Sequence, residues 1–248
     1  DALEMLIQVS GIGKGDEVIF SSHTMVATAS AISANQAKPI PVECSIDHLI
    51  DPISVEQAIN SNTKCIMPTQ LNGRTANMDE ICRIADEYGL LIIEDSAQAL
   101  GSKYKGKNAG TFGIGGCISF YPAKLLGCFG DGGMVLCNDS EIYNKLLLLR
   151  DHGRDQKTGD VVIWGRNSRL DNLQAALLRY QFKNYEQSIE RRRQLAVLYH
   201  KNLINVSEVV LPPPPNESSD HFDVYQNYEI EAERRDELKT YLFENGVG

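Results

Sequence analysis

The sequence lacks a surplus of positive charge, and this excludes a large class of functions. It has 24 lysines and arginines against 33 aspartates and glutamates, which gives a formal net charge of −9 at pH 7. A protein that binds nucleic acid needs a patch of positive charge to neutralise phosphates. The one basic run, 191–193, follows Glu186 and Glu190 in a helical stretch, and we interpret it as a solvated helix face. We therefore expect no nucleic-acid partner.

Long apolar runs and paired cysteines are also missing. No run approaches the roughly 18 apolar residues that a membrane-spanning helix needs, and the opening residues do not resemble a signal peptide. The six cysteines include no CxxC pair and no Cys/His spacing typical of a metal site. We expect free thiols in a reducing cytoplasm, no membrane association and no metal ligands.

Both ends of the sequence lie within predicted structure. The chain opens at Asp1 without an initiator Met and already in an amphipathic helical pattern, and it stops at Gly248 just as a helix finishes. We expect the sequence to be truncated at both ends.

Short apolar runs alternate with helical patterns up to about residue 150. The predicted strands span 17–21, 38–44, 64–68, 90–95, 117–121 and 134–137, and the predicted helices lie near 24–35, 54–60, 77–88 and 140–150. The runs are continuous and rich in β-branched residues, which is typical of strands covered on both faces. The pattern predicts an α/β fold with a mostly parallel sheet flanked by helices.

A different organisation follows residue 150. A long helical region is predicted over 170–203, and the four prolines at 212–215 cannot continue a helix. After them, 224–230 has the pattern of a strand and 234–244 that of a helix. We predict a large α/β domain over residues 1–205, and the beginning of a smaller α+β domain over residues 206–248.

Two predicted strand ends carry residues that could do chemistry. The run 90–95 ends in Glu94 and Asp95, and ligands of open α/β sheets bind outside the carboxyl ends of the strands. These carboxylates could instead solvate a strand end or cap the next helix. Lys124 follows the run 117–121 among apolar neighbours, where desolvation would lower its pKa toward the range of Schiff-base chemistry. Taken alone, however, it is better interpreted as an ordinary surface lysine.

Asp95 and Lys124 are more informative together than either is alone. Residues at the ends of two parallel strands converge on the same edge of a sheet. A pyridoxal cofactor needs such a pair, since a lysine holds it covalently and an acid keeps its pyridine nitrogen protonated. The pair therefore indicates a pyridoxal-phosphate enzyme.

Two glycine-rich stretches fit other cofactors poorly. The segment 11–15 precedes a predicted strand rather than following it, which is the wrong order for a dinucleotide-binding turn, and 127–133 lacks the ending of a phosphate-binding loop. His152 lies close to a helix end, and we interpret it as a local cap rather than a catalytic residue.

Several longer motifs resemble a known family. They are GIGKGDEVIF, IIEDSAQALGSKYKGK, GTFGIGGCISFYPAKLLG, GDGGMVLCND, LRDHG and NSRLDNLQAALL, in this order. Together they resemble the DegT/DnrJ/EryC1/StrS aminotransferases, which place amino groups on keto sugars that are usually carried as nucleotide sugars. The resemblance covers residues 1–200 and continues more weakly through 222–230.

The resemblance implies an aspartate aminotransferase-like fold in which the large domain binds pyridoxal 5′-phosphate. Lys124 is similar to the Schiff-base lysine and Asp95 to the acid on the pyridine nitrogen. Gln98 resembles the residue that hydrogen-bonds the cofactor's phenolic oxygen, and Ser119 resembles a phosphate ligand. Asn167 is similar to an asparagine that reaches the phosphate of the neighbouring subunit's cofactor, which implies a homodimer with shared active sites.

The sequence departs from the family pattern at two places. Met25 stands where many relatives carry an aromatic ring over the pyridine, and a thioether can also pack on a ring face, so we expect weaker stacking. The family's Ser-Gly-Thr-like turn, which holds the phosphate at a helix N-terminus, would immediately precede Asp1. We therefore expect part of the phosphate cup to be absent.

The resemblance implies transamination of a keto sugar, which in this family is usually linked to a nucleotide, with glutamate as amino donor. Some relatives use the same scaffold for sugar dehydration with a His in place of the lysine, and Lys124 favours transamination. The further alternatives are a non-catalytic homologue acting as a regulatory or binding protein, and an inactive fragment of the enzyme.

Overall fold

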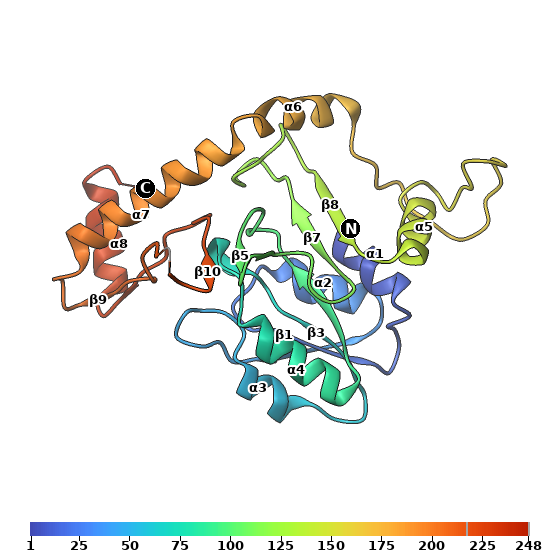
Figure 1. Ribbon diagram of the computed structural model, residues 1–248, viewed down its shortest axis with the longest axis horizontal. Helices are drawn as coiled ribbons and strands as arrows, with labels where there is room; N and C mark the ends of the chain where they lie inside the picture. The colour runs from blue at the N-terminus through green and yellow to red at the C-terminus, as the bar shows by residue number, and fades with distance from the viewer. Residues whose placement is uncertain (217, 248) are drawn as a thin grey trace.

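The core of the structure is a six-stranded sheet, seen in a computed structural model that describes residues 1–216 and 218–247 (Figure 1). Its strands are β1 (Glu17–Ser21), β2 (Lys38–Val42), β3 (Thr63–Met67), β4 (Leu91–Asp95), β7 (Gly115–Ser119) and β8 (Gly133–Cys137). The order is β2-β1-β3-β4-β7-β8, and every pairing is parallel except that of β7 with β8. The prediction of an α/β fold with a mostly parallel sheet is confirmed, and each of the six strands predicted before residue 150 is present within a few residues.

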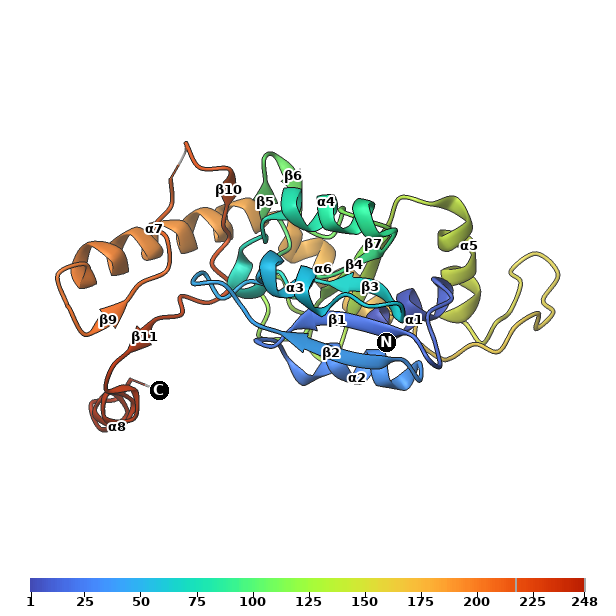
Figure 2. The same cartoon turned by 90° about the horizontal axis from the view of Figure 1, so that it is seen from below.

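Helices cover both faces of this sheet, as Figure 2 shows. One face packs against α1 (Ala2–Val9), α2 (Val26–Ala34) and α5 (Ser140–Leu149), and the other against α3 (Pro52–Ala58) and α4 (Met78–Tyr88). Two apolar cores result, and this explains why the strands are continuous apolar runs.

Local sequence signals set the starts of several of these helices. Asp51 caps α3 by accepting from the backbone N–H groups of Ile53 and Ser54. Asn77 and Asp139 cap α4 and α5 in the same way. Short polar caps therefore fix where each chain segment leaves the sheet and turns back over it.

The predicted helical region 170–203 is two helices rather than one. These are α6 (Asn172–Phe182) and α7 (Tyr185–Leu203), separated by Lys183 and Asn184. The first turns of α7 pack Tyr185 and Ile189 into a third apolar cluster beside β7, and the helix then runs away from the sheet (Figure 1).

The predicted strand at 224–230 is wrong. The chain there has no regular structure, and the strands are the short segments on either side. β10 (His221–Phe222) pairs with β5 (Lys103–Tyr104), which also pairs with β6 (Lys107–Asn108), and β11 (Glu231–Ala232) pairs with β9 (Val209–Val210).

The physical reason lies in how the segment 223–226 is held. Tyr225 has φ +50°, a left-handed conformation that interrupts a ladder. The neighbouring side chains are buried one by one in separate polar contacts, since Asp223 pairs with Arg74 and Gln226 bonds to the loop after β7. The apolar pattern of 224–230 therefore comes from side chains that are buried against the large domain.

The helix predicted at 234–244 is present as α8 (Arg235–Glu244), and the domain boundary near residue 205 stays a prediction.

Within the described residues, every helix is too short or too polar to cross a lipid bilayer.

Glu94, the residue before Asp95, is a fully buried carboxylate on the α4 side of the sheet. It accepts hydrogen bonds from Gln70 Nε2 at 2.7 Å, from the Gly110 N–H at 2.9 Å and from the Phe112 N–H at 2.6 Å. Burial raises its pKa to about 7, and the three donors act against that rise. Glu94 therefore joins the loop 110–112 to the sheet rather than solvating a strand end.

We expect Glu94→Ala to lower the free energy of unfolding by about 3 kcal/mol or more. The substitution leaves three buried donors without an acceptor, and each costs roughly 1–3 kcal/mol. Denaturant unfolding measures the effect. Glu186→Ala, on an exposed face of α7, is the matched control and should change stability by no more than about 0.5 kcal/mol. Equal stability of the two variants would contradict a structural role for Glu94.

Candidate active site

Asp95 ends β4 with its carboxylate enclosed, and the residue is 4% exposed. The Thr28 hydroxyl donates to its Oδ2 at 2.6 Å, and the Ala97 N–H donates to its Oδ1 at 3.2 Å. Burial raises the pKa of Asp95, while Thr28, Ala97 and the positive charge of Lys124 oppose the rise. Both carboxylate oxygens are therefore oriented, on the face of the sheet opposite to Glu94.

Three threonine hydroxyls form a chain that ends on Asp95. The Thr69 hydroxyl donates to Thr24 Oγ1 at 2.9 Å, and the hydroxyls of Thr24 and Thr28 lie 2.7 Å apart. Because the Thr28 proton points to Asp95, Thr24 is the donor to Thr28. All three protons then point toward the carboxylate, an arrangement in which each bond polarises the next.

The sequence analysis did not predict this chain of hydroxyls, although two features of the sequence indicate it. Thr24 and Thr28 are four residues apart at the start of α2, a spacing that places side chains on one face of a helix. Thr69 follows the end of β3, at the same sheet edge as Asp95. An inspection of hydroxyls at strand ends would have found them.

Lys124 lies in a tight turn after β7, where its backbone N–H donates to the Tyr121 carbonyl at 2.8 Å. The side chain is half-buried, and burial lowers its pKa, whereas the negative charge of Asp95 raises it. The structure therefore brings Lys124 within electrostatic reach of Asp95. Gly127 closes the turn, since a Cβ there would lie 2.8 Å from the carbonyl oxygens of Tyr121 and Pro122.

Gln226 holds the Lys124 turn from behind. Its Nε2 donates to the Ala123 carbonyl at 2.9 Å, and its Oε1 accepts from the Leu125 N–H at 2.7 Å. The residues on both sides of Lys124 are thus fixed by one buried carboxamide from the C-terminal part of the chain. The sequence pattern gave no sign of this contact, which spans 103 residues.

Gln98 and Ser119 lie near the same edge of the sheet. Gln98 Oε1 accepts from the Asn72 N–H at 2.7 Å, so its amide NH2 group is the end available as a donor. Ser119 is the last residue of β7, and its Oγ accepts from the Tyr121 N–H at 3.2 Å. Its hydroxyl hydrogen remains free to point outward.

The start of α1 lies against β7. Burial raises the pKa of the Cys117 thiol of β7 well above its usual value, and Met5, Leu6 and Ile7 of α1 lie in the same apolar core. Backbone N–H groups in the first turn of a helix attract anions. The edge of β7 and the start of α1 therefore suit a phosphate group.

The other two predicted site residues are placed differently. Met25 is 68% exposed and precedes the first turn of α2, next to Thr24. Asn167 is exposed and lies opposite Asp151 beyond α5, where its Oδ1 accepts from the Arg169 guanidinium. Asp95 and Ser119 thus end the neighbouring strands β4 and β7, Gln98 and Lys124 follow these ends, and only Asp95 and Lys124 are close enough to influence each other's pKa. Asn167 lies beyond α5.

Known proteins resemble the chain over its whole length. The family model described as the DegT/DnrJ/EryC1/StrS aminotransferase family matches residues 1–248. The "Pleiotropic regulatory protein" of Geobacillus stearothermophilus is 41% identical, with 100% of this chain and 66% of the relative covered. The "dTDP-3-amino-3,4,6-trideoxy-alpha-D-glucose transaminase" of Streptomyces venezuelae is 42% identical, with 100% of this chain and 64% of the relative covered.

A solved structure agrees with these matches. The S. venezuelae DesV in complex with a ketimine intermediate superimposes with a TM-score of 0.94 at 41% identity, over 100% of this chain and 66% of that one. The chain therefore spans slightly less than two thirds of that protein's length. From the full-length family match, the sequence identity and the shared fold, the chain belongs to the DegT/DnrJ/EryC1/StrS aminotransferase family, a family of pyridoxal-phosphate-dependent enzymes.

Proposed function

We propose that the protein is an aminotransferase that uses pyridoxal phosphate to place an amino group on a nucleotide-linked keto sugar, with glutamate as the donor. One observation carries the proposal. A buried, doubly hydrogen-bonded Asp95 lies within electrostatic reach of a half-buried Lys124 at the carboxyl edge of the sheet.

The residues fit the cofactor. A carboxylate as deeply buried as Asp95 needs a positive partner, and a protonated pyridine nitrogen supplies one. The amide of Gln98 has its NH2 end free to donate to the phenolic oxygen. The Ser119 hydroxyl and the first N–H groups of α1 provide donors for the phosphate, and Met25 offers a thioether to the ring face.

When bound, the cofactor withdraws electrons from the Cα atom of the amino donor. Asp95 would keep the ring nitrogen protonated. This protonation makes the withdrawal of electrons from Cα strong. Lys124 Nζ would hold the cofactor covalently and, once freed, would take the proton from the Cα atom of the donor as general base and give it back as general acid. Burial lowers the pKa of Lys124, which is the direction of change that favours a base.

Two observations support a sugar substrate. The Streptomyces venezuelae relative is named for an amino sugar carried on dTDP. A pocket lies beside Gln98, and its polar lining includes Asn72, Arg74 and Asn227, whose side chains can hydrogen-bond the hydroxyls of a sugar.

We also propose a homodimer in which Asn167 reaches the partner's cofactor, and a cytoplasmic location. Large apolar side chains are exposed around α6, where Leu173 is 81% exposed and Phe129 is 82% exposed, and Trp164 is 93% exposed in the loop before it. Exposed apolar groups of this size mark a contact surface. All six cysteines are free thiols, which suits a reducing compartment.

A second candidate function is regulation without catalysis. It is favoured by the printed name of the Geobacillus stearothermophilus relative. A regulator would not need the Asp95–Lys124 pair, which is retained here.

The covalent role of Lys124 can be tested by trapping. The protein expressed from its complete reading frame is incubated with pyridoxal phosphate, reduced with borohydride and digested. We expect one label, located by mass spectrometry on Lys124, and no label in Lys124→Ala. Lys14→Ala, which alters an exposed lysine, should keep the label.

Addition of glutamate before the reduction separates the two candidate functions. An aminotransferase loses the label, because the cofactor leaves Lys124 in its amine form. A label that glutamate does not remove contradicts glutamate as donor, and a wild type that takes up no label contradicts the enzyme proposal altogether.

The coupling between Asp95 and Lys124 predicts a pH shift. Without cofactor, the reactivity of Lys124 toward an acylating reagent rises with pH as its amine loses a proton. Asp95 raises the pKa of Lys124, so Asp95→Asn should move the midpoint of this rise to lower pH. Peptide mass spectrometry follows each lysine, and Lys14 should react alike in both proteins. An unchanged or higher midpoint would show that the two groups do not interact.

A further inference from the structure

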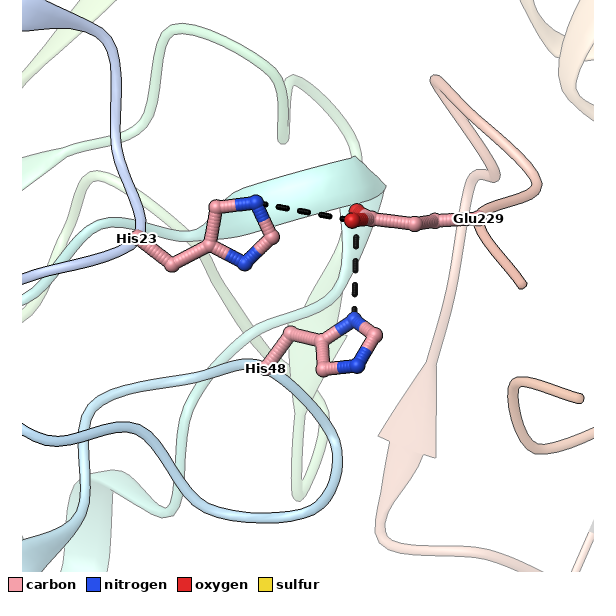
Figure 3. A group of neighbouring side chains, drawn as sticks. All are labelled: His23, His48 and Glu229. Carbon is pink, nitrogen blue, oxygen red and sulfur yellow. Dashed lines mark ion pairs between the residues drawn. The ribbon is translucent and has the colours of Figure 1, made fainter. Parts of the chain in front are cut away.

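Three side chains from distant parts of the sequence meet at one point of the surface (Figure 3). His23 follows β1, His48 follows β2, and Glu229 precedes β11. His23 Nε2 lies 3.4 Å from Glu229 Oε1, and His48 Nδ1 lies 3.8 Å from Glu229 Oε2. The ligand atoms of all three lie within 4.8 Å of one another.

These separations suit a small metal ion. Zinc binds imidazole nitrogen and carboxylate oxygen at about 2.0–2.1 Å, which puts tetrahedral ligand atoms about 3.3 Å apart. The 3.4 Å and 3.8 Å separations from Glu229 are close to this value, so small side-chain rotations complete the geometry. Three protein ligands leave one position for water.

The side chains behind His48 are arranged as in metal sites. Its Nε2 lies 2.8 Å from Glu231 Oε1, on the side of the ring away from the cluster. Donation of the Nε2 proton to Glu231 leaves the Nδ1 lone pair directed toward Glu229 and His23. Metal-binding histidines usually donate their other ring N–H to a carboxylate in this way.

Glu229 is also oriented from behind. The Asn72 Nδ2 donates to Glu229 Oε2, and Asn72 Oδ1 accepts from Asn227 Nδ2 at 3.0 Å. The carboxylate therefore cannot turn freely, although it is only partly buried.

The backbone supports the same reading at His48. This residue has φ +65°, a conformation that favours glycine or asparagine, and the turn is closed by hydrogen bonds from His48 N–H to the Ser45 carbonyl and from Ser45 N–H to the Leu49 carbonyl. Unfavourable backbone conformations of this kind occur where a side chain is needed at a fixed place.

We propose that His23, His48 and Glu229 bind a divalent first-row transition-metal cation such as Zn²⁺. Two imidazoles and one carboxylate are a ligand set that such cations prefer, whereas Ca²⁺ and Mg²⁺ prefer oxygen ligands alone. Sequence spacing gave no hint of it, because the site joins turns near the N-terminus to a segment more than 180 residues later, as the 183-residue separation of His48 and Glu231 shows.

The cation ties the segment leading into β11 to the turns after β1 and β2. His48, Glu229 and Glu231 also line the pocket beside Gln98, so the same cation fixes one wall of that pocket. A ligand that binds only the folded state stabilises it by mass action. None of the three ligands has been given a role with the cofactor, and His48 and Glu229 line the pocket proposed for the sugar.

Zn²⁺ titration of the metal-free protein, followed by calorimetry, tests the site. We expect one Zn²⁺ per chain in the wild type. His48→Asn and Glu229→Gln should each weaken binding by more than about 100-fold, and Glu231→Gln by about 10- to 100-fold, as expected for a residue behind a ligand. Asn suits the left-handed backbone at His48, and Gln keeps the hydrogen bond with Asn72.

His152→Asn is the matched control. His152 is an exposed histidine that, like His48, has a positive φ, at +61°, and the same substitution there should leave Zn²⁺ affinity unchanged. Zn²⁺ should raise the thermal unfolding midpoint of the wild type and of this control, and not that of His48→Asn or Glu229→Gln. Absence of one-to-one binding, or equal affinity in His48→Asn and the wild type, overturns the proposal, since the histidines and glutamate would then only pair with each other.

Discussion

Asp95 is a buried carboxylate, and the 2.6 Å hydrogen bond from Thr28 is the strongest of the contacts that oppose the rise of its pKa on burial. Thr28 takes its own hydrogen bond from the chain that begins at Thr69. The start of α2, the end of β3 and the end of β4 are therefore locked together by one line of hydroxyl protons. Everything proposed for the cofactor depends on this line, because it sets where a pyridine nitrogen can be held.

Lys124 is positioned near Asp95 by a different set of contacts. The turn that carries it is closed by Gly127 and clamped by Gln226, a residue from the C-terminal part of the chain. The same C-terminal segment brings Glu229 to His23 and His48. The irregular stretch 223–230 thus links both the Lys124 turn and the candidate metal site to the sheet, and this role explains its buried side chains better than a strand would.

Sequence reasoning recovered what depends on local pattern. The apolar runs located the six strands of the sheet, and strand-end position selected Asp95 and Lys124 as a pair. It missed contacts between segments far apart in sequence, namely the hydroxyls behind Asp95 and the carboxamide of Gln226. It also predicted a strand at 224–230. The buried side chains of this irregular segment each make their own contact with the large domain, and they give the sequence the same apolar composition as a buried strand. The hydrophobic periodicity of a sequence indicates which residues are buried, but it does not indicate which residues they contact.

The central claim is that Asp95 holds a proton on the cofactor's ring nitrogen. It is tested most directly by ¹⁵N NMR of the protein loaded with pyridoxal phosphate labelled at that nitrogen. We expect the chemical shift of a protonated nitrogen in the wild type and of an unprotonated one in Asp95→Asn. An unprotonated nitrogen in the wild type, or the same protonated shift in both proteins, would contradict the account.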